Sequence, residues 1–211
     1  MKVHIKHLSI LFALILVLSF ALQPVSAAQM VYSGDDSNSR YGNLESFMTL
    51  ATNRTINFDS ESAVKAGIDK DIITAVRSQI DYMNHMVLTQ DAYIDDTFTL
   101  TVYFPSTRAR GESKVVTHWY GLTEVYLNST EAEELIDSFS AVGDATSISG
   151  LVGMLPGPIA SAIGNISGIL SFSTMIYRKQ IEAAAEPGNG IIMYVQNNFE
   201  YGTQSIWFTS Q

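Results

Sequence analysis

The chain has 211 residues, with 12 basic against 21 acidic side chains, a net charge of −9 and no cysteine. This length suits one ordinary domain with a substantial core. The acidic balance excludes nucleic acid and anionic lipid as partners recognised by charge, and it differs from the small cationic antimicrobial peptides. The lack of cysteine excludes disulfide scaffolds, thiolate metal sites and cysteine nucleophiles.

The start of the chain predicts a cleavable secretory signal peptide. Two lysines open the chain, and the 15 residues Leu8–Leu22 carry no charge. Small residues then lead to Ala27 and Ala28, and cleavage is expected after one of these two alanines. The apolar run is shorter than the roughly 20 residues of a comfortable membrane span. Removal of residues 1–27 takes both lysines and no acid, which changes the net charge from −9 to −11. The predicted location is therefore outside the cell.

The next elements are predicted from composition and hydrophobic period. Residues 28–59 are rich in Ser, Asn, Asp and Gly, which predicts a flexible mature N-terminus with little core. Asp69–Leu88 has the 3.6-residue apolar spacing of an amphipathic helix. The period changes to two in Phe98–Phe104, as in a half-buried strand. A second β run covers Lys114–Asn128, with an interruption at Gly121.

The C-terminal part predicts a helix, an uncharged segment and a closing hairpin. Thr130-x-x-Glu133 has the form of a capping box at a helix start. Ile191–Asn197 and Ser205–Thr209 are expected to pair as a β-hairpin. The predicted fold is one α+β domain over residues 60–211. It combines a small antiparallel sheet, an amphipathic helix and an apolar Gly/Ser-rich helical hairpin.

The sequence predicts no catalytic, cofactor or metal site, and no enzyme. Only His85 and His118 remain after processing, too few for a histidine-based metal cluster. Asp95-Asp96 precedes a strand and is expected to form a turn rather than an acid–base pair. There is no Gly-x-Ser-x-Gly elbow, so a serine hydrolase has no support.

The uncharged segment is the most unusual feature of the sequence. The 33 residues from Ala145 to Tyr177 contain no charged side chain. Small residues recur at every fourth position, which would place a ridge for close packing on each of two helices. A Pro-Gly-Pro sequence between the two helices predicts a tight reversal. The ridge and turn residues of this candidate membrane-active hairpin are Ala145, Ser149, Gly153, Pro156, Gly157, Pro158, Gly164 and Gly168.

Two interpretations of this hairpin remain open. It could be the buried centre of the domain, which its many serines favour. It could instead be stored for insertion into a membrane. The 20 residues Pro158–Tyr177 would reach about 30 Å as a helix and match a bilayer core. The 11 residues Ala145–Leu155 would reach only about 16 Å, so the two arms would not span symmetrically.

A series of motifs follows residue 115, namely Trp119–Asn128, Leu135-Ile136, the apolar hairpin, Gly188–Ile192 and Ile206-Trp207. These motifs resemble those of a group of small secreted proteins of Gram-positive bacteria, some of them bacteriocin-like. The resemblance covers roughly residues 115–211 and is closer to the larger, heat-tolerant bacteriocins than to the small cationic ones. It implies an antibacterial protein acting at a competitor's envelope, with a cognate immunity protein as a candidate partner.

The expected function is therefore that of a secreted, bacteriocin-like antibacterial protein. Residues 145–177 would perturb the membrane of the target cell, without a cofactor and without nucleic acid. The alternative is a secreted binding or interaction module of the cell envelope, without enzymatic activity. Such a module would bind through aromatic side chains around Trp119, Tyr120 and Tyr126.

Overall fold

The structure is a computed structural model, and it describes most of the chain after residue 40. The described residues are 41–105, 109–142, 145–147, 171–186 and 188–211. Contacts divide the chain into residues 1–36 and 37–211, and every described residue belongs to the second unit.

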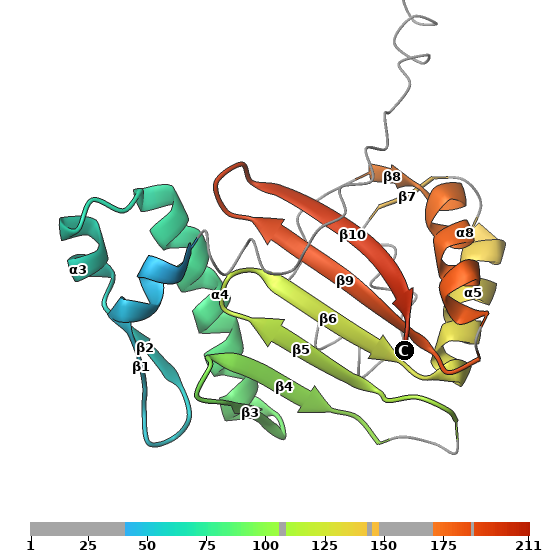
Figure 1. Ribbon diagram of the computed structural model, residues 1–211, viewed down its shortest axis with the longest axis horizontal. Coiled ribbons are helices and arrows are strands. Elements are labelled where there is room, and N and C mark those ends of the chain that lie inside the picture. Colours follow the sequence, from blue (N-terminus) through green and yellow to red (C-terminus); the bar gives the residue numbers. More distant parts are fainter. Residues whose placement is uncertain (1–40, 106–108, 143–144, 148–170, 187) are drawn as a thin grey trace, which may run out of the picture. The chain divides into compact units, whose positions relative to one another are not determined.

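Six strands of this unit form one antiparallel sheet, in the order β10-β9-β6-β5-β4-β3 (Figure 1). Together with the helices, this sheet confirms the predicted α+β class with an antiparallel sheet. The strands are β3 (Ala92–Ile94), β4 (Thr99–Tyr103), β5 (Lys114–His118), β6 (Leu122–Leu127), β9 (Ile191–Asn198) and β10 (Thr203–Ser210).

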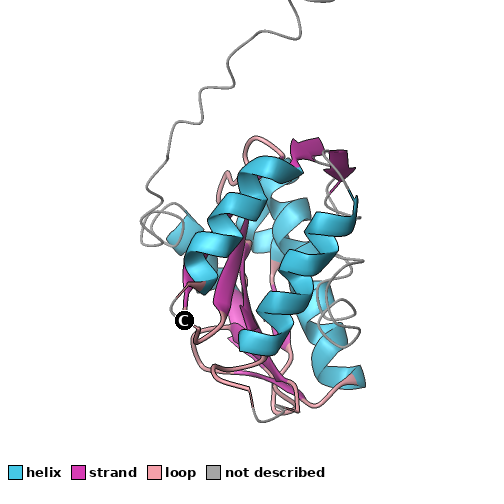
Figure 2. Ribbon diagram, turned by 90° about the vertical axis from the view of Figure 1, so that its right-hand side faces the viewer, coloured by secondary structure: helices cyan, strands magenta, loops and turns pink. Residues whose placement is uncertain are grey.

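Four α-helices, one 3-10 helix and two small ribbons accompany the sheet in the described part of the chain (Figure 2). The α-helices are α3 (Ser60–Lys65), α4 (Lys70–Thr89), α5 (Ser129–Val142) and α8 (Thr174–Ala185). A 3-10 helix, η1 (Gly42–Phe47), leads into the ribbon of β1 (Met48–Leu50) and β2 (Ile56–Phe58). A second ribbon pairs β7 (Ala145–Ser147) with β8 (Ser171–Ser173).

One face of the sheet belongs to the core. Because side chains alternate along a strand, directly paired residues share a face. Val102, Val115, Val125 and Met193 are consecutive partners across four strands, and all four are buried. Burying a side chain of this size contributes about 1.5–3 kcal/mol to folding. The predicted helix is confirmed as α4, whose buried residues, Ile73, Val76, Ile80, Met83 and Met86, follow the helical period.

Residues 41–58 correct the expectation of a flexible N-terminus that extends to residue 59. Tyr41, Leu44, Met48 and Ile56 are all buried in the hydrophobic core. The Asn84 side chain also holds this segment, because its amide accepts from the Ile56 N–H at 2.7 Å and donates to the Ile56 carbonyl at 2.9 Å. The apolar residues of this segment are widely spaced in a polar stretch and follow neither the helical nor the strand period, so the sequence did not predict their burial. Tertiary contacts bring them into the core.

The start of α5 corrects the predicted capping box. The helix is capped by Asn128, whose side-chain oxygen accepts from the N–H groups of Thr130 and Glu131 at 3.1 Å each. The Glu131 carboxylate accepts from the Asn128 N–H in return, at 2.9 Å. The reciprocal pair that defines a capping box is therefore Asn128 with Glu131, two residues earlier than Thr130 with Glu133.

Strand β6 pairs with β9 across a long insertion. The pairing runs from Leu122 opposite Gln196 to Leu127 opposite Ile191, and residues 128–190 lie between the two strands in sequence. The side chain of Gln211, which follows β10, reinforces this junction. Its nitrogen donates to the carbonyls of Leu127 at 2.9 Å and Ile191 at 3.2 Å, so it joins both strands.

The junction predicts a sharp difference between two neighbouring glycines. Both Gly188 (φ +71°) and Gly190 (φ +98°) lie in the left-handed region. A Cβ at Gly190 would lie 2.3 Å from the Leu127 carbonyl oxygen, whereas one at Gly188 would meet nothing within 4 Å. We expect Gly188→Ala to lower the free energy of unfolding by about 1 kcal/mol, and Gly190→Ala by about 3 kcal/mol or more. Thermal unfolding of both variants measures the difference, and equal losses would contradict the close approach.

The corrected capping box predicts which substitutions weaken α5. Asn128→Ala should lower the free energy of unfolding by about 1 kcal/mol or more, because the cap of two N–H groups is lost. Thr130→Ala and Glu133→Ala, both at exposed positions of the box predicted from sequence, should change it by less than about 0.5 kcal/mol. Urea unfolding curves would refute the assignment if Glu133→Ala cost as much as Asn128→Ala.

Candidate functional site

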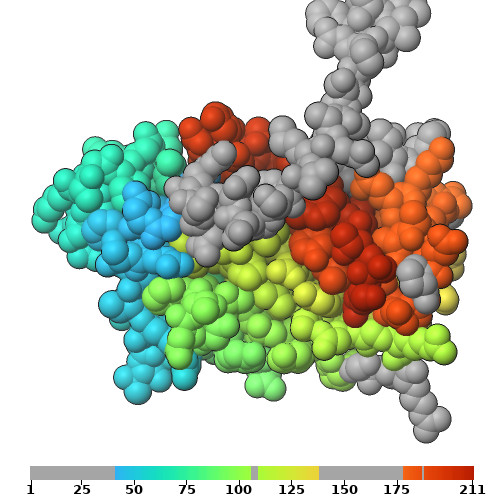
Figure 3. Space-filling view, viewed as in Figure 1, coloured from blue at the N-terminus to red at the C-terminus, as the bar shows by residue number. Residues whose placement is uncertain are grey.

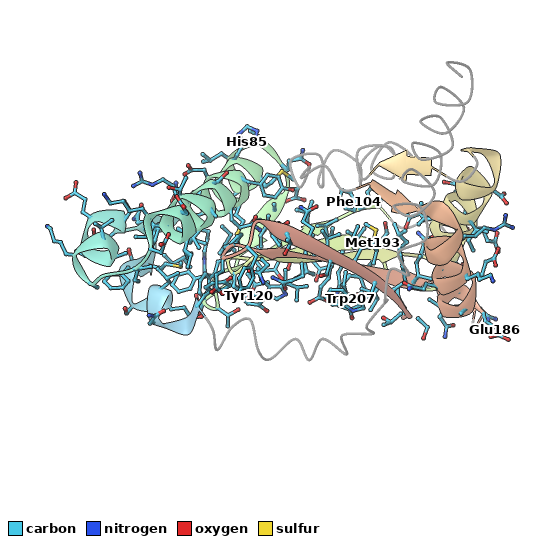
Figure 4. The ribbon with its side chains drawn as sticks, turned by 90° about the horizontal axis from the view of Figure 1, so that it is seen from above. His85, Phe104, Tyr120, Glu186, Met193 and Trp207 are labelled. Carbon is cyan, nitrogen blue, oxygen red and sulfur yellow. The ribbon has the colours of Figure 1, made fainter. Side chains whose placement is uncertain are left out.

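The second face of the sheet, here called the open face, carries aromatic and polar side chains. The labelled Tyr120 and Trp207 lie on this side, whereas His85 of α4 lies on the other (Figure 4). On the side seen in Figure 3, atoms of β4, β5 and β6, coloured green to yellow, reach the surface. Two rows of direct partners cross the open face. One row is Tyr93, Thr101, Val116, Glu124, Tyr194 and Trp207, and the other is Tyr103, Lys114, Tyr126, Ile192 and Thr209.

A tyrosine–lysine–glutamate group occupies the middle of the open face. The Tyr126 hydroxyl donates to the Glu124 carboxylate at 2.7 Å. The Lys114 ammonium lies 4.3 Å from the centroid of the Tyr126 ring, a cation–π distance. It also forms an ion pair with Glu112. Towards β10, the Tyr194 and Trp207 rings are stacked at 5.0 Å with their planes 3° apart.

His118 lies on the same face, between two carboxylates. Its Nε2 is 3.0 Å from Glu124 Oε1, and its Nδ1 is 3.2 Å from Thr99 Oγ1. The Thr99 hydroxyl is 3.1 Å from that of Thr97, which donates to Asp95 at 2.6 Å. A chain of two hydroxyls therefore connects the imidazole to the second carboxylate.

The hydrogen bonds around His118 fix the position of its ring. The Thr97 hydroxyl donates to the Asp95 carboxylate, which can only accept. The two ring nitrogens of His118 face Glu124 and Thr99, and the tautomer decides which nitrogen donates. The imidazole is therefore held between strands β4 and β6 by partners on both sides.

Hydrogen bonds lower the pKa values of both carboxylates. Burial acts to raise the pKa of Glu124, but hydrogen bonds from His118 and Tyr126 outweigh it and hold that pKa below its ordinary value of 4.5. Burial likewise opposes a lowered pKa for Asp95, and hydrogen bonds from Thr97 and Thr99 overcome it. Burial and the Glu124 hydrogen bond raise the pKa of the Tyr126 hydroxyl. The phenol therefore remains a donor, and Glu124 remains charged, at neutral pH.

Of the three aromatic residues predicted for a binding module, the structure brings two to the open face. Tyr120 stacks on the His118 ring at 5.0 Å, and Tyr126 bonds to Glu124. Trp119 corrects the prediction, because it is only 1% exposed and its Nε1 donates to Glu45 at 3.2 Å. The sequence did not reveal Tyr93, because its strand is only three residues long and shows no period. It also did not reveal Tyr103 as a site residue, because alternation along β4 places this side chain away from the core but does not show which residues lie beside it.

The predicted membrane-active residues fall largely outside the described part of the chain. Ala145 lies in strand β7, paired with Ser173, rather than in a helix. Residues 171–173 form β8, so the predicted continuous helix from Pro158 to Tyr177 is also corrected there. Among the described residues, no helix has both the length and the apolar character needed to cross a membrane. The members outside the described residues are Ser149, Gly153, Pro156, Gly157, Pro158, Gly164 and Gly168, together with the cleavage residues Ala27 and Ala28.

The described residues bring together no group of three His, Cys, Asp or Glu side chains that could hold a metal ion. His85 lies on α4, where its carbonyl accepts from the Thr89 hydroxyl at 2.7 Å. Asp95-Asp96 lies in the turn between β3 and β4, where the Asp95 carboxylate accepts from the N–H groups of Thr97 and Thr99.

Known proteins do not assign a function to this fold or to its open face. No protein-family model, no curated protein and no solved structure matches the chain. The resemblance to bacteriocin-like proteins therefore stays a prediction.

The lowered pKa of Glu124 predicts a pH dependence of stability. Because the folded-state pKa of Glu124 is lowered, its contribution is present above its ordinary value of 4.5 and is lost as pH falls through the lowered value. Glu124→Gln should lower the free energy of unfolding at pH 7 by about 1–3 kcal/mol. It should also flatten the loss of stability below pH 4.5.

Thermal unfolding between pH 7 and pH 3 measures both effects. Glu133→Gln, at an exposed position on α5, is the matched control and should follow the parent protein throughout. An acid profile of Glu124→Gln that is parallel to that of the parent protein would contradict the lowered pKa of Glu124.

Proposed function

We propose that the protein is a secreted, bacteriocin-like antibacterial protein that perturbs the target-cell membrane with its uncharged segment. The observation that carries this proposal is the place of residues 145–177 in the topology. They belong to the insertion between β6 and β9, two strands that pair directly with each other. No strand of the six-stranded sheet comes from this insertion.

This topology supports release of the segment without unfolding of the domain. Movement of residues 148–170 would break none of the backbone ladders between β3 and β10. The sheet and the junction at Leu127 and Ile191 would stay paired. The cost of release would be limited to contacts of the segment and, if the movement extended further, to the β7–β8 ribbon.

The β7–β8 ribbon sets a limit on how deeply the segment can insert. Its last pair, Ser147 with Ser171, holds the two ends of residues 148–170 together. The predicted reversal at Pro156–Pro158 divides these 23 residues into arms of 8 and 12 residues, and helical arms of those lengths reach about 12 Å and about 18 Å. A bilayer core is about 30 Å thick. With the ribbon closed, the segment would wedge into one leaflet, and crossing the bilayer would require the ribbon to open.

The charge of the protein restricts the lipid that such a wedge would meet. With a net charge of −9 for the whole chain, anionic lipid repels the domain, whereas zwitterionic lipid does not. Perturbation of anionic vesicles should therefore increase with salt, because salt screens the repulsion.

A loop replacement tests the proposal. Because Ser147 and Ser171 are direct partners, residues 148–170 can be replaced by Asn-Gly, which closes a two-residue hairpin. We expect this short-loop variant to retain its β-sheet signal in circular dichroism. It should lose leakage of dye-loaded phosphatidylcholine vesicles and inhibition of susceptible bacteria.

The parent protein and a Gly164→Leu plus Gly168→Leu variant complete the experiment. The double variant should lose leakage if close packing of the glycine ridge is needed for the active form. The proposal fails if the parent protein leaves vesicles and bacteria intact, or if the short-loop variant is folded and as active as the parent.

A further inference from the structure

The most exposed aromatic side chains of the open face gather at its β3–β4 edge. Tyr103 is 58% exposed and Tyr93 is 48% exposed. Tyr93 of β3 is the direct partner of Thr101 of β4. Tyr103 lies two residues after Thr101 on β4, so Tyr93 and Tyr103 are diagonal neighbours on one face of the sheet. Diagonal neighbours lie about 7–8 Å apart, within mutual reach of aromatic side chains. Two rings and two phenol hydroxyls therefore face solvent together.

Two charged groups beside these tyrosines have partners of their own. Lys114 is the direct partner of Tyr103 on β5 and forms an ion pair with Glu112. Glu124 accepts from Tyr126 and faces His118. The surface beside the two tyrosines thus offers ring faces, a carboxylate and an ammonium group, and the latter two groups already have partners within the protein.

We infer that this edge of the open face, made by Tyr93, Tyr103, Lys114, Tyr126 and Glu124, is a binding site for an uncharged glycan. A sugar presents a C–H surface, which packs on the negative face of an aromatic ring. It also presents hydroxyls, which bond to phenol, carboxylate and ammonium groups. The strands hold these groups in register, so ordering them costs little on binding.

The same observations disfavour the other classes of ligand. An anionic polymer would meet a net charge of −9 and only one lysine in the site, which is already neutralised by Glu112. The centre of a protein–protein interface is depleted of charged residues, whereas Glu124 and Lys114 are half-buried at the centre of this site. A glycan brings hydroxyls to such groups, so that they stay hydrogen-bonded when water leaves.

A glycan would be the ligand of the binding module considered from the sequence, and its site contains none of residues 145–177. The test uses calorimetric titration of the protein with the tetramer of N-acetylglucosamine and, separately, the tetramer of glucose. We expect binding of at least one tetramer, weakened at least about tenfold by Tyr103→Ala and by Tyr93→Ala. Tyr201→Ala is the matched control. This residue is also highly exposed, at 66%, but lies in the turn between β9 and β10.

The dependence of glycan binding on the two tyrosines distinguishes a glycan site from other roles of this edge. Binding that requires Tyr93 and Tyr103, survives Tyr201→Ala and is unchanged in the short-loop variant supports the inference, even if the vesicle assay fails. The inference is overturned if neither tetramer binds. It is overturned equally if the Tyr103→Ala and Tyr93→Ala variants, folded by circular dichroism, bind as the parent does. Tyrosine-dependent binding to phosphatidylcholine vesicles in place of the tetramers would overturn it in favour of a membrane-interface role.

Discussion

The pairing of β6 with β9 is the contact on which the rest of the fold depends. It joins Leu127 to Ile191 and divides the chain into a sheet-forming part and an insertion attached at both ends. Because the insertion leaves and returns at this junction, α5 and α8 are brought together, and their Leu135 and Ile181 side chains are buried in the core. At Gly190 the backbone approaches β6 so closely that a Cβ would overlap a carbonyl oxygen, so the junction also requires glycine.

Elements with a strong local period could be predicted from the sequence, and elements defined by distant contacts could not. Helix α4 and strand β4 lie where their apolar spacing placed them, because every turn or pleat repeats the same signal. The 41–58 segment has only scattered apolar residues, and its order depends on Asn84, 28 positions away from Ile56. The cap of α5 was misplaced because Asn128, Ser129 and Thr130 are all good capping residues, and only tertiary position selects among them.

The open face shows the same limit for a candidate site. Alternation alone places Tyr103 and Tyr126 away from the core, but only the register brings Lys114 between them. The structure places His118 in a network with two carboxylates, Glu124 directly and Asp95 through the hydroxyls of Thr97 and Thr99. Of these, Glu124 is six residues away and Asp95 is 23 residues away in sequence, so no motif of short spacing could have revealed the network.

The bond between Gln211 and the β6–β9 junction has a consequence for synthesis. A chain made from its N-terminus presents β3 to β6 first, then the uncharged segment, and only afterwards β9, β10 and Gln211. The hydrogen bonds from Gln211 to Leu127 and Ile191 can therefore form only after everything before them has emerged. Such late, long-range closure makes folding slow relative to local structure formation. The sheet therefore stays incomplete while the insertion is being made, and apolar side chains of β3 to β6 and of the insertion lack their final partners during that interval.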